Sequence, residues 1–379
     1  MKKKILFCAT VDYHFEAFHL PYMKWFQEQD WEVHVAASGN LNLPFTDKKY
    51  NISIQRSPLS IKNGYAYKEL KKIINDNGYE IIHCHTPVGG ALARLAARDA
   101  RKKGTKVLYT AHGFHFYKGA PLLNWLLYYP IERGLSYFTD CLITINEEDY
   151  TLAINHRFGA KRITHVHGVG VDTERFKPID EMDKGKLRSK LGYKRDDFLM
   201  FYAAEFNANK NQQLLIKVLA KIKDDVPHAR LLLAGKGPLQ DDLKKLAEEL
   251  DVSTMVDFLG FRKDLEEIIP MCDIAVASSL REGLPVNIME AMACGLPVIA
   301  SENRGHKELV RNDINGWIID PEDIDAMAEK IKTVAQNKSL ANRLGKSGRT
   351  IVENTFSIDK VQKELTSIYS TYMNCSEGK

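Results

Sequence analysis

The sequence is poor in cysteine and contains no CxxC pair. Most of its cysteines lie inside apolar runs; the six are Cys8, Cys84, Cys141, Cys272, Cys294 and Cys375. Such positions favour buried thiols in a reducing compartment over disulfides or zinc ligands. We therefore expect a cytoplasmic protein with no metal bound by cysteine.

Long hydrophobic runs and a strong excess of one charge are also missing. No stretch approaches 18 uninterrupted apolar residues, so we expect no transmembrane helix. The apolar run that follows the first lysines is interrupted by Asp12 and His14, which favours a first buried strand over a signal peptide. The net charge is only +4, and no basic stripe edged by aromatic residues is present, so nucleic-acid binding is not expected.

Short apolar runs alternate with amphipathic stretches along all 379 residues. This alternation predicts parallel sheets covered by helices on both faces, and the length favours two such domains. The expected strands are 4–10, 32–37, 80–83, 106–111, 141–145, 163–167, 198–203, 230–234, 256–259, 274–277, 298–300 and 317–319. The expected helices are 17–29, 67–75, 91–103, 122–137, 147–158, 211–223, 239–250, 264–271, 285–293, 322–336, 340–353 and 358–372. The polar, proline-containing stretch 177–181 places the domains at 1–178 and 179–356.

The most informative stretch is SSLREGLPVNIMEAMACGLPVIA, which covers residues 278–300 and follows an apolar strand. Pro285 suits the first position of a helix, where its missing N–H costs nothing. The free N–H groups around Val286, with the helix dipole behind them, predict an anion pocket at the helix start. Gly283 lets a ligand approach the backbone closely.

Two carboxylates flank this predicted pocket. Glu282 lies just before the helix and Glu290 within it, where each can accept hydrogen bonds from sugar hydroxyls. Either glutamate alone is more typical of a solvated surface. The complete strand, loop and helix together favour a site for a nucleotide-diphosphate sugar.

The run EGLPVNIME followed by AMACGLPVIA resembles the signature of retaining glycosyltransferases of family 4, which have the GT-B fold. HGVGVDTERF at 167–176, ANKNQ at 208–212 and FLGFRKDL at 258–265 extend the resemblance over most of the chain. In the first half, HFEAFHLP, HCHTPVGGALARLAA, YTAHGFHFYKGAP and ERGLSYFTDCLITINEED resemble the branch that builds bacterial exopolysaccharide and capsule. The resemblance implies two Rossmann-like doubly wound α/β domains facing a central cleft, with a C-terminal helix at about 357–375 packed back on the first domain.

The resemblance also implies roles for individual residues. A catalytic set is implied at His112, Glu282 and Lys210, in which Lys210 neutralises the leaving diphosphate. Further donor contacts are implied for the ribose, the sugar, the diphosphate and the base; they are Phe261, Arg262, Gly283, Leu284, Pro285, Val286 and Glu290. Relatives commonly carry an arginine where this chain has Glu205, which cannot bind phosphate in its place. Glu205 is left as a donor-side residue that orients Lys210 or binds a sugar amide or hydroxyl.

Several histidines follow the expected strands of the first half. The resemblance implies that His112 polarises and positions the donor sugar, and we place His14, His85 and His115 on the acceptor side. For His83 we expect a satisfied histidine at a strand end. No carboxylate lies at metal-ligand spacing nearby, and the family implies no required metal, so we expect neither a metal nor a cofactor.

The implied activity is that of a hexosyltransferase that moves an N-acetylhexosamine or hexose from a UDP-linked donor with retention. The implied acceptor is an undecaprenyl-diphosphate-linked glycan of exopolysaccharide or capsule synthesis. A GT-B nucleotide-sugar epimerase and a catalytically silent nucleotide-sugar-binding partner of an assembly complex remain alternatives. The aromatic and apolar stretch 122–129 favours a buried helix, with peripheral contact at the inner face of the membrane as the alternative.

Overall fold

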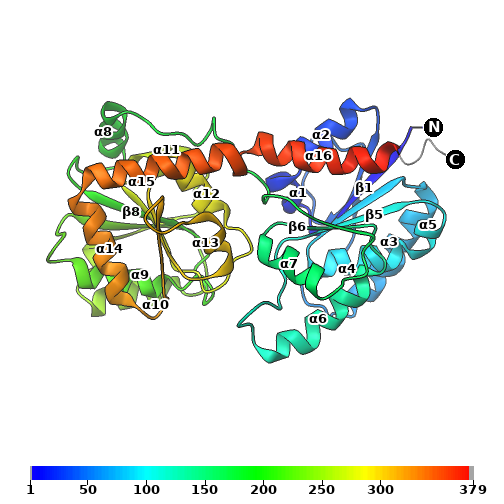
Figure 1. The fold of residues 1–379 in the computed structure, drawn as a ribbon, viewed down its shortest axis with the longest axis horizontal. Helices are drawn as coiled ribbons and strands as arrows, with labels where there is room; N and C mark the ends of the chain where they lie inside the picture. The colour runs from blue at the N-terminus through cyan, green and yellow to red at the C-terminus, as the bar shows by residue number, and fades with distance from the viewer. Residues whose placement is uncertain (1, 375–379) are drawn as a thin grey trace. The chain divides into compact units, whose positions relative to one another are not determined.

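The computed structural model describes residues 2–374, which form two α/β units (Figure 1). The N-terminal unit contains the chain up to Val169 and again from Val361 onward. The C-terminal unit is Gly170–Lys360. The last helix, α16 (Ile358–Asn374), therefore starts in the C-terminal unit and continues into the N-terminal one.

The N-terminal unit is built on a seven-stranded parallel sheet with the order β3-β2-β1-β4-β5-β6-β7. Its strands are β1 Lys4–Val11, β2 Glu32–Ser38, β3 Lys48–Asn51, β4 Ile81–His85, β5 Lys106–Ala111, β6 Cys141–Thr144 and β7 Arg162–His165. The helices between them are α1 Tyr13–Phe18, α2 Leu20–Glu28, α3 Lys62–Asn77, α4 Pro87–Ala96, α5 Arg98–Lys102, α6 Leu122–Ser136 and α7 Glu147–Asn155.

The C-terminal unit is built on a six-stranded parallel sheet with the order β10-β9-β8-β11-β12-β13. Its strands are β8 Phe198–Ala203, β9 Ala229–Ala234, β10 Val256–Gly260, β11 Ile274–Ala277, β12 Val298–Ser301 and β13 Gly316–Ile319. Its helices are α8 Glu181–Lys190, α9 Gln212–Ile222, α10 Gln240–Glu249, α11 Leu265–Ile268, α12 Val286–Ala293, α13 Arg304–Leu309, α14 Ile324–Gln336 and α15 Lys338–Ile351. Short helical turns occupy Ser253–Met255, Ile269–Met271 and Val352–Phe356.

Both sheets reverse their strand order next to their first strand. In the N-terminal unit β1 lies between β2 and β4, and in the C-terminal unit β8 lies between β9 and β11. Loops diverge at the carboxyl ends of the two strands on either side of such a switch point, and doubly wound proteins bind ligands in the resulting crevice. Lys210 and Glu282 of the C-terminal unit, and His14 and His85 of the N-terminal unit, lie at these places.

The doubly wound α/β class is confirmed, while several predicted boundaries are wrong. The expected helix 17–29 is broken at His19 into α1 and α2, and the expected helix 91–103 starts at Pro87 and breaks at Ala97. Three elements were not predicted. The edge strand β3 is the polar sequence KKYN, α8 lacks an apolar stripe, and α13 has only six residues, so none carries a readable period.

The described cysteines are buried, as the apolar runs around them indicated. Cys8, Cys84, Cys141, Cys272 and Cys294 are buried free thiols, whereas Cys375 lies outside the described residues. Between residues 2 and 374, no helix combines the length and the apolar character needed to cross a bilayer.

Candidate functional site

Lys210 and Glu282 meet at the switch point of the C-terminal unit. Lys210 lies in the loop after β8 and Glu282 in the loop after β11, the strand that pairs with β8. The Lys210 Nζ atom is 2.5 Å from Glu282 Oε1, and the two side chains are 24% and 15% exposed. The structure therefore brings together two of the residues predicted from separate motifs.

Hydrogen bonds hold these two loops against each other. Asn209 Nδ2 donates to the carbonyl of Arg281 at 3.0 Å, and the Leu280 N–H donates to the carbonyl of Asn209 at 2.8 Å. Ser278 Oγ donates to the Lys210 carbonyl at 2.7 Å. The ammonium and the carboxylate thus sit on backbone that is fixed from both sides.

The helix after Glu282 begins one residue later than predicted. Pro285 is the N-cap of α12, with φ −79° and ψ 117°, and Val286 is the first helical residue. Proline has no side-chain acceptor with which to cap the first turn, so the N–H groups at this end depend on other partners. Asn287 ties the start of the helix to β8, because its Nδ2 donates to the Ala203 carbonyl at 2.9 Å.

The short helix α13 supports the Glu282 loop from behind. Arg304 Nε donates to the Glu282 carbonyl at 3.1 Å. A Cβ on Gly305 would come within 2.8 Å of both Glu282 Cβ and the Gly283 carbonyl oxygen, so only glycine allows this close approach. His306 is buried, which lowers its pKa to about 4, and the charges of Lys210 and Glu282 also act on it. Sequence analysis missed these residues; the RGH sequence at the start of α13, two residues after β12, was the available signal.

Glu290 lies on α12, where it is half-buried. Burial raises the pKa of its carboxyl group to about 7; the positive charge of Arg175 opposes this rise, and the negative charge of Glu266 adds to it. A carboxyl group whose pKa lies near 7 is present at neutral pH in two forms. The acid can donate a hydrogen bond to a diol, and the carboxylate can accept one from it. Such a perturbed group on the helix that follows the Glu282 loop is a functional candidate.

The other predicted donor residues lie in neighbouring loops. Glu205 is exposed, and its Oε2 accepts from Asn207 Nδ2 at 3.2 Å, while Asn207 Oδ1 accepts from the Lys210 N–H at 3.1 Å. Glu205 thus reaches the backbone of Lys210 through Asn207. Phe261 is 68% exposed in the loop after β10, and the Arg262 guanidinium pairs with Asp264.

In the N-terminal unit, four histidines converge at the carboxyl ends of the adjacent strands β1, β4 and β5. His85 ends β4, His112 follows β5, and His14 and His19 belong to the segment after β1. The Nε2 atoms of His14 and His19 are 3.1 Å apart, and His85 Nδ1 is 3.4 Å from His112 Nε2. Sequence analysis missed His19 because it treated 17–29 as one continuous helix.

We define the histidine cluster as His14, His19, His85 and His112. His83 and His115 are not members of it, although the His83 ring packs against His85 with 4.1 Å between centroids. His83 behaves as predicted, with Tyr369 Oη 2.6 Å from its Nδ1 and Thr110 Oγ1 2.8 Å from its Nε2. His115 stacks on Tyr128 with 4.7 Å between ring centroids and is not part of the cluster.

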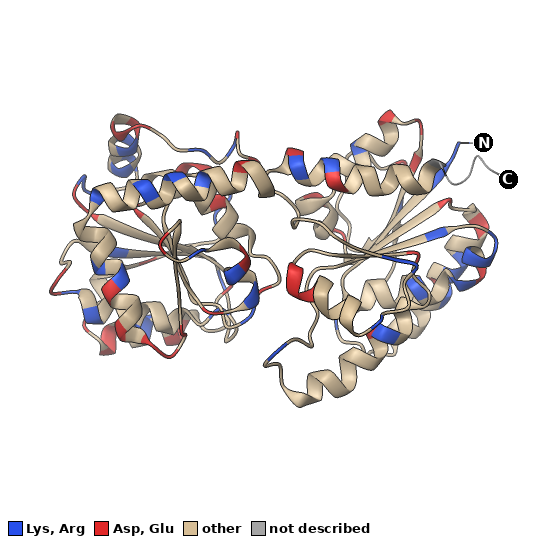
Figure 2. Ribbon diagram, in the orientation of Figure 1, with Lys and Arg blue, Asp and Glu red and all other residues tan. Residues whose placement is uncertain are grey.

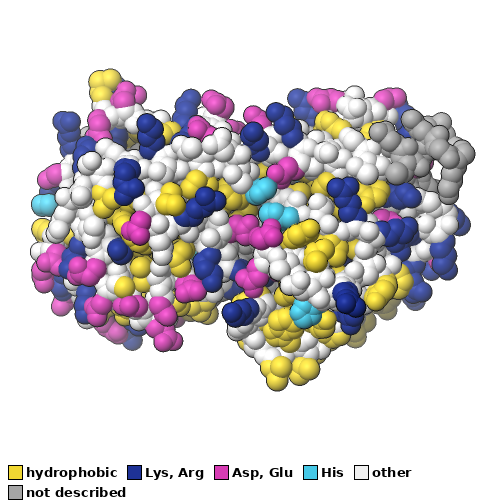
Figure 3. All heavy atoms as spheres, in the orientation of Figure 1, with side chains coloured by type: hydrophobic (Ala, Val, Ile, Leu, Met, Phe, Trp, Pro, Cys, Tyr) yellow, Lys and Arg dark blue, Asp and Glu magenta, His cyan; other side chains and the backbone are white. Residues whose placement is uncertain are grey.

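Helix α6 is only partly buried, contrary to the buried helix that its composition favoured. Trp125 and Tyr129 pack against the core, and Phe116 lies within 5.6 Å of the Trp125 ring centroid. Its other face is exposed over five large apolar side chains, namely Leu122, Leu123, Leu126, Leu127 and Ile131. We call these five residues the α6 apolar face. The ribbon of α6 carries almost no charge (Figure 2), and hydrophobic side chains gather over it (Figure 3).

Known families match both units. The model described as "Glycosyl transferase 4-like" matches residues 4–146, and "Glycosyl transferases group 1" matches residues 183–351. With an ammonium–carboxylate pair at the switch point of a doubly wound domain, these matches define a glycosyltransferase of two Rossmann-like domains. The chain belongs to the group 1 glycosyltransferases with a 4-like N-terminal domain.

Two relatives and one solved structure are informative. The chain is 52% identical over 374 residues to "Putative glycosyltransferase EpsD" of Bacillus subtilis (strain 168), covering 99% of this chain and 98% of that protein. It is 31% identical to the Escherichia coli "UDP-Gal:alpha-D-GlcNAc-diphosphoundecaprenol alpha-1,3-galactosyltransferase", over 82% and 80% of the two chains. The Anabaena Alr3699/HepE structure in complex with UDP shares the fold, with a TM-score of 0.79, 20% identity and coverage of 98% and 100%.

Proposed function

We propose that this protein is a retaining hexosyltransferase that moves a hexose or N-acetylhexosamine from a UDP-sugar to a lipid-linked glycan acceptor. The observation that carries this proposal is the Lys210–Glu282 pair at the switch point of the C-terminal unit. The UDP in the Anabaena structure and the UDP-Gal and diphosphoundecaprenol in the name of the Escherichia coli relative support the choice of donor and acceptor.

In this proposal the pair opens when the donor binds. The diphosphate takes Lys210 as its cation and the start of α12 as its amide donors, and Glu282 is left to accept hydrogen bonds from the sugar hydroxyls. As the bond to the sugar breaks, negative charge grows on the leaving diphosphate, and a fixed ammonium stabilises that charge more than it stabilises the ground state. Hydrogen bonds fix the backbone of the two loops, so both groups already lie near their places when the donor separates them.

The remaining assignments follow from the same arrangement. Glu290 is assigned to the ribose hydroxyls, and the loop of Phe261 and Arg262 to the base. Because Arg262 is paired with Asp264, we assign the base contact to the backbone of this loop and the exposed Phe261 ring. His112 is assigned to the donor sugar on the family resemblance, and Glu205 to positioning Lys210 through Asn207.

We also propose that the α6 apolar face touches the membrane that carries the acceptor. Its five apolar side chains are between 51% and 73% exposed. Lys118 before the helix and Arg133 near its end are exposed, while Glu132, the acidic residue of α6, is half-buried and paired with Arg94. An apolar face flanked by cations is suited to the interface of an anionic bilayer.

The test is a transfer assay with the full chain. A panel of UDP-sugars is incubated with and without undecaprenyl-diphosphate-linked N-acetylglucosamine, and products are followed by mass spectrometry. Transfer that needs the acceptor, with the anomeric configuration of the donor kept in the product by NMR, supports the proposal. Inversion refutes the retaining mechanism. Donor conversion without acceptor identifies an epimerase, and donor binding without turnover of any pair identifies a silent binding partner.

A further inference from the structure

The histidine cluster brings four imidazoles to one place, whereas the proposed sugar transfer assigns a role to His112 alone. Each of its four rings offers one nitrogen, and four such nitrogens lie within 4.8 Å of one another. We propose that the cluster of His14, His19, His85 and His112 binds one late first-row divalent metal ion, with Zn²⁺ as its reference ion.

The spacing of the nitrogens is close to what such an ion requires. Zn–N bonds of about 2.0–2.1 Å in a tetrahedron place neighbouring nitrogens about 3.3 Å apart. Two separations inside the cluster lie on either side of that value: 3.1 Å between the Nε2 atoms of His14 and His19, and 3.4 Å between His85 Nδ1 and His112 Nε2. Small rotations of the rings would bring the two pairs together around one ion, because the widest separation is within 4.8 Å.

The polar atoms of the cluster are not satisfied by the protein alone. His19 Nδ1 and His85 Nε2 are buried and have no hydrogen-bond partner among residues 2–374. Both side chains are almost completely buried, at 3% and 0% exposure. Buried polar groups without a partner are uncommon, and a ligand that the protein chain does not supply is one explanation for them. They are the second nitrogens of these two rings, because the close pairs use His19 Nε2 and His85 Nδ1. They show that the chain leaves polar atoms of the cluster without a partner, while the spacing of the close pairs carries the assignment of the ion.

The donor set also selects the metal. The group contains four imidazoles and no carboxylate. Mg²⁺ and Ca²⁺ prefer oxygen ligands, whereas imidazole suits Zn²⁺, Cu²⁺ and Ni²⁺. Four nitrogen ligands complete a tetrahedral shell, which is the arrangement of a structural site. The ion would therefore fasten the segment after β1, which carries His14 and His19, to the carboxyl ends of β4 and β5.

Neighbouring side chains fix the rings in this arrangement. Phe7 stacks on His85 with 6.5 Å between centroids and 11° between planes. The His14 and His112 rings meet edge to face, with centroids 4.8 Å apart. The rings stand at strand ends and pack against their neighbours. They therefore lose little conformational freedom when the ion binds. This inference shares His112 with the proposed transfer. An ion held by the Nε2 atom of His112 leaves its Nδ1 atom to meet the donor sugar.

The test is a titration of the full chain after removal of metals with EDTA, using Co²⁺ as a spectroscopic probe and then Zn²⁺ in competition. We expect one Co²⁺ per chain with the intense visible bands of a tetrahedral site, displaced by one Zn²⁺. His19→Gln and His85→Gln should each weaken binding by at least about 100-fold, because loss of a partner that only orients a ligand already costs about 10- to 100-fold. The matched control is His156→Gln, an exposed histidine of the same unit outside the cluster, which should leave binding unchanged.

A measurement on the unaltered protein covers the case in which a variant does not fold. X-ray absorption of the chain loaded with one equivalent of Zn²⁺ should show four nitrogen ligands at about 2.0–2.1 Å. The proposal is overturned if one equivalent does not bind, if the shell is dominated by oxygen, or if folded His19→Gln protein binds as tightly as the control. In those cases the rings are joined only by the hydrogen bonds His14–His19 and His85–His112.

Discussion

Lys210 and Glu282 lie 72 residues apart in the chain, yet their side chains form an ion pair with 2.5 Å between Nζ and Oε1. The pair exists because β8 and β11 are neighbours in the sheet although β9 and β10 separate them in sequence. Both side chains are largely buried, so removing one leaves the other charge without its partner, which is costly away from water. Every variant of the pair therefore needs a check of its folded state.

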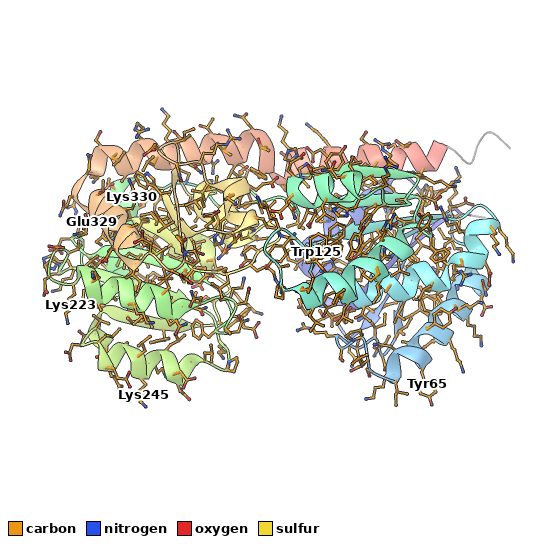
Figure 4. The ribbon with its side chains drawn as sticks, turned by 60° about the horizontal axis from the view of Figure 1, so that its bottom comes forward. Tyr65, Trp125, Lys223, Lys245, Glu329 and Lys330 are labelled. Atoms are coloured by element: carbon orange, nitrogen blue, oxygen red, sulfur yellow. The ribbon has the colours of Figure 1, made fainter. Side chains whose placement is uncertain are left out.

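Lys210→Ala should abolish transfer while the fold stays intact. The leaving diphosphate loses its fixed cation, and we expect kcat/KM to fall by at least about 100-fold, or about 2.7 kcal/mol of transition-state stabilisation. The measurement is the transfer assay, with circular dichroism to verify folding. Lys245→Ala is the control, because Lys245 projects from α10 into solvent (Figure 4) and its side chain is 75% exposed. Unchanged turnover in folded Lys210→Ala protein would remove the assignment.

Substitutions of Glu282 and Glu290 should affect different quantities, namely turnover for Glu282 and nucleotide affinity for Glu290. Glu282→Ala should lower kcat more than it changes the Kd of UDP, because the carboxylate is assigned to the sugar. Glu290→Ala should instead raise the Kd of UDP, on the order of 10-fold for the loss of a charged hydrogen-bond acceptor. Calorimetric titration with UDP and steady-state kinetics of each variant measure the two effects. If Glu282→Ala weakened UDP binding more than Glu290→Ala did, the two assignments would have to be exchanged.

Donor binding should weaken as the pH falls through neutrality. The pKa of Glu290 is raised to about 7 by burial, so its acceptor form is lost below that pH. If the ribose hydroxyls bind the carboxylate, the Kd of a UDP-sugar should rise about 10-fold between pH 8 and pH 6. Glu290→Gln is the matched variant, and its Kd should be nearly flat over this range. A slope retained by Glu290→Gln would assign the titration to another group.

The α6 apolar face should be required for binding of the protein to membranes. We expect the unaltered chain to co-sediment with anionic liposomes. A variant with Leu122, Leu126 and Leu127 changed to serine should stay in the supernatant, because burial of each apolar side chain contributes about 1.5–3 kcal/mol to binding. Met182→Ser removes an apolar side chain that is 64% exposed on α8 and should still sediment. Unaltered protein that stays in the supernatant would exclude this membrane contact.

Acid should destabilise the N-terminal unit, because its buried histidines are neutral. Burial lowers the pKa of His83 to about 3 and of His14 to about 2, against 6.5 for an unperturbed imidazole. At a pH between the folded and the unfolded pKa, the imidazole is protonated in the unfolded chain but not in the folded unit. The free energy of unfolding therefore decreases as the pH falls below about 6.5. The loss at pH 5.5 should be on the order of 1 kcal/mol for each of the two groups. Thermal unfolding of the metal-free protein at pH 7.5 and 5.5 measures it, and folded His83→Gln protein should show a shallower decline.

Most regular elements could be predicted from the sequence. The twelve apolar runs predicted as strands all appear in the sheets, and the EGLPVNIME sequence does lie in the loop and helix after β11. These features are local, because a period of two or 3.6 residues reports which side of one segment is buried. The edge strand β3 and the helices α8 and α13 were not readable for the same reason, since a short or polar element has too few buried positions.

The meeting of distant residues was decided by tertiary structure alone. Sequence motifs marked Lys210 and Glu282 separately, and they marked His14, His85 and His112 without showing that His19 joins them. Those contacts depend on which strands are neighbours, on the break between α1 and α2 at His19, and on a glycine at 305 that lets α13 approach the Glu282 loop. Strand order and loop packing are set by how the whole sheet buries its apolar surface, and no single segment of the chain contains that information.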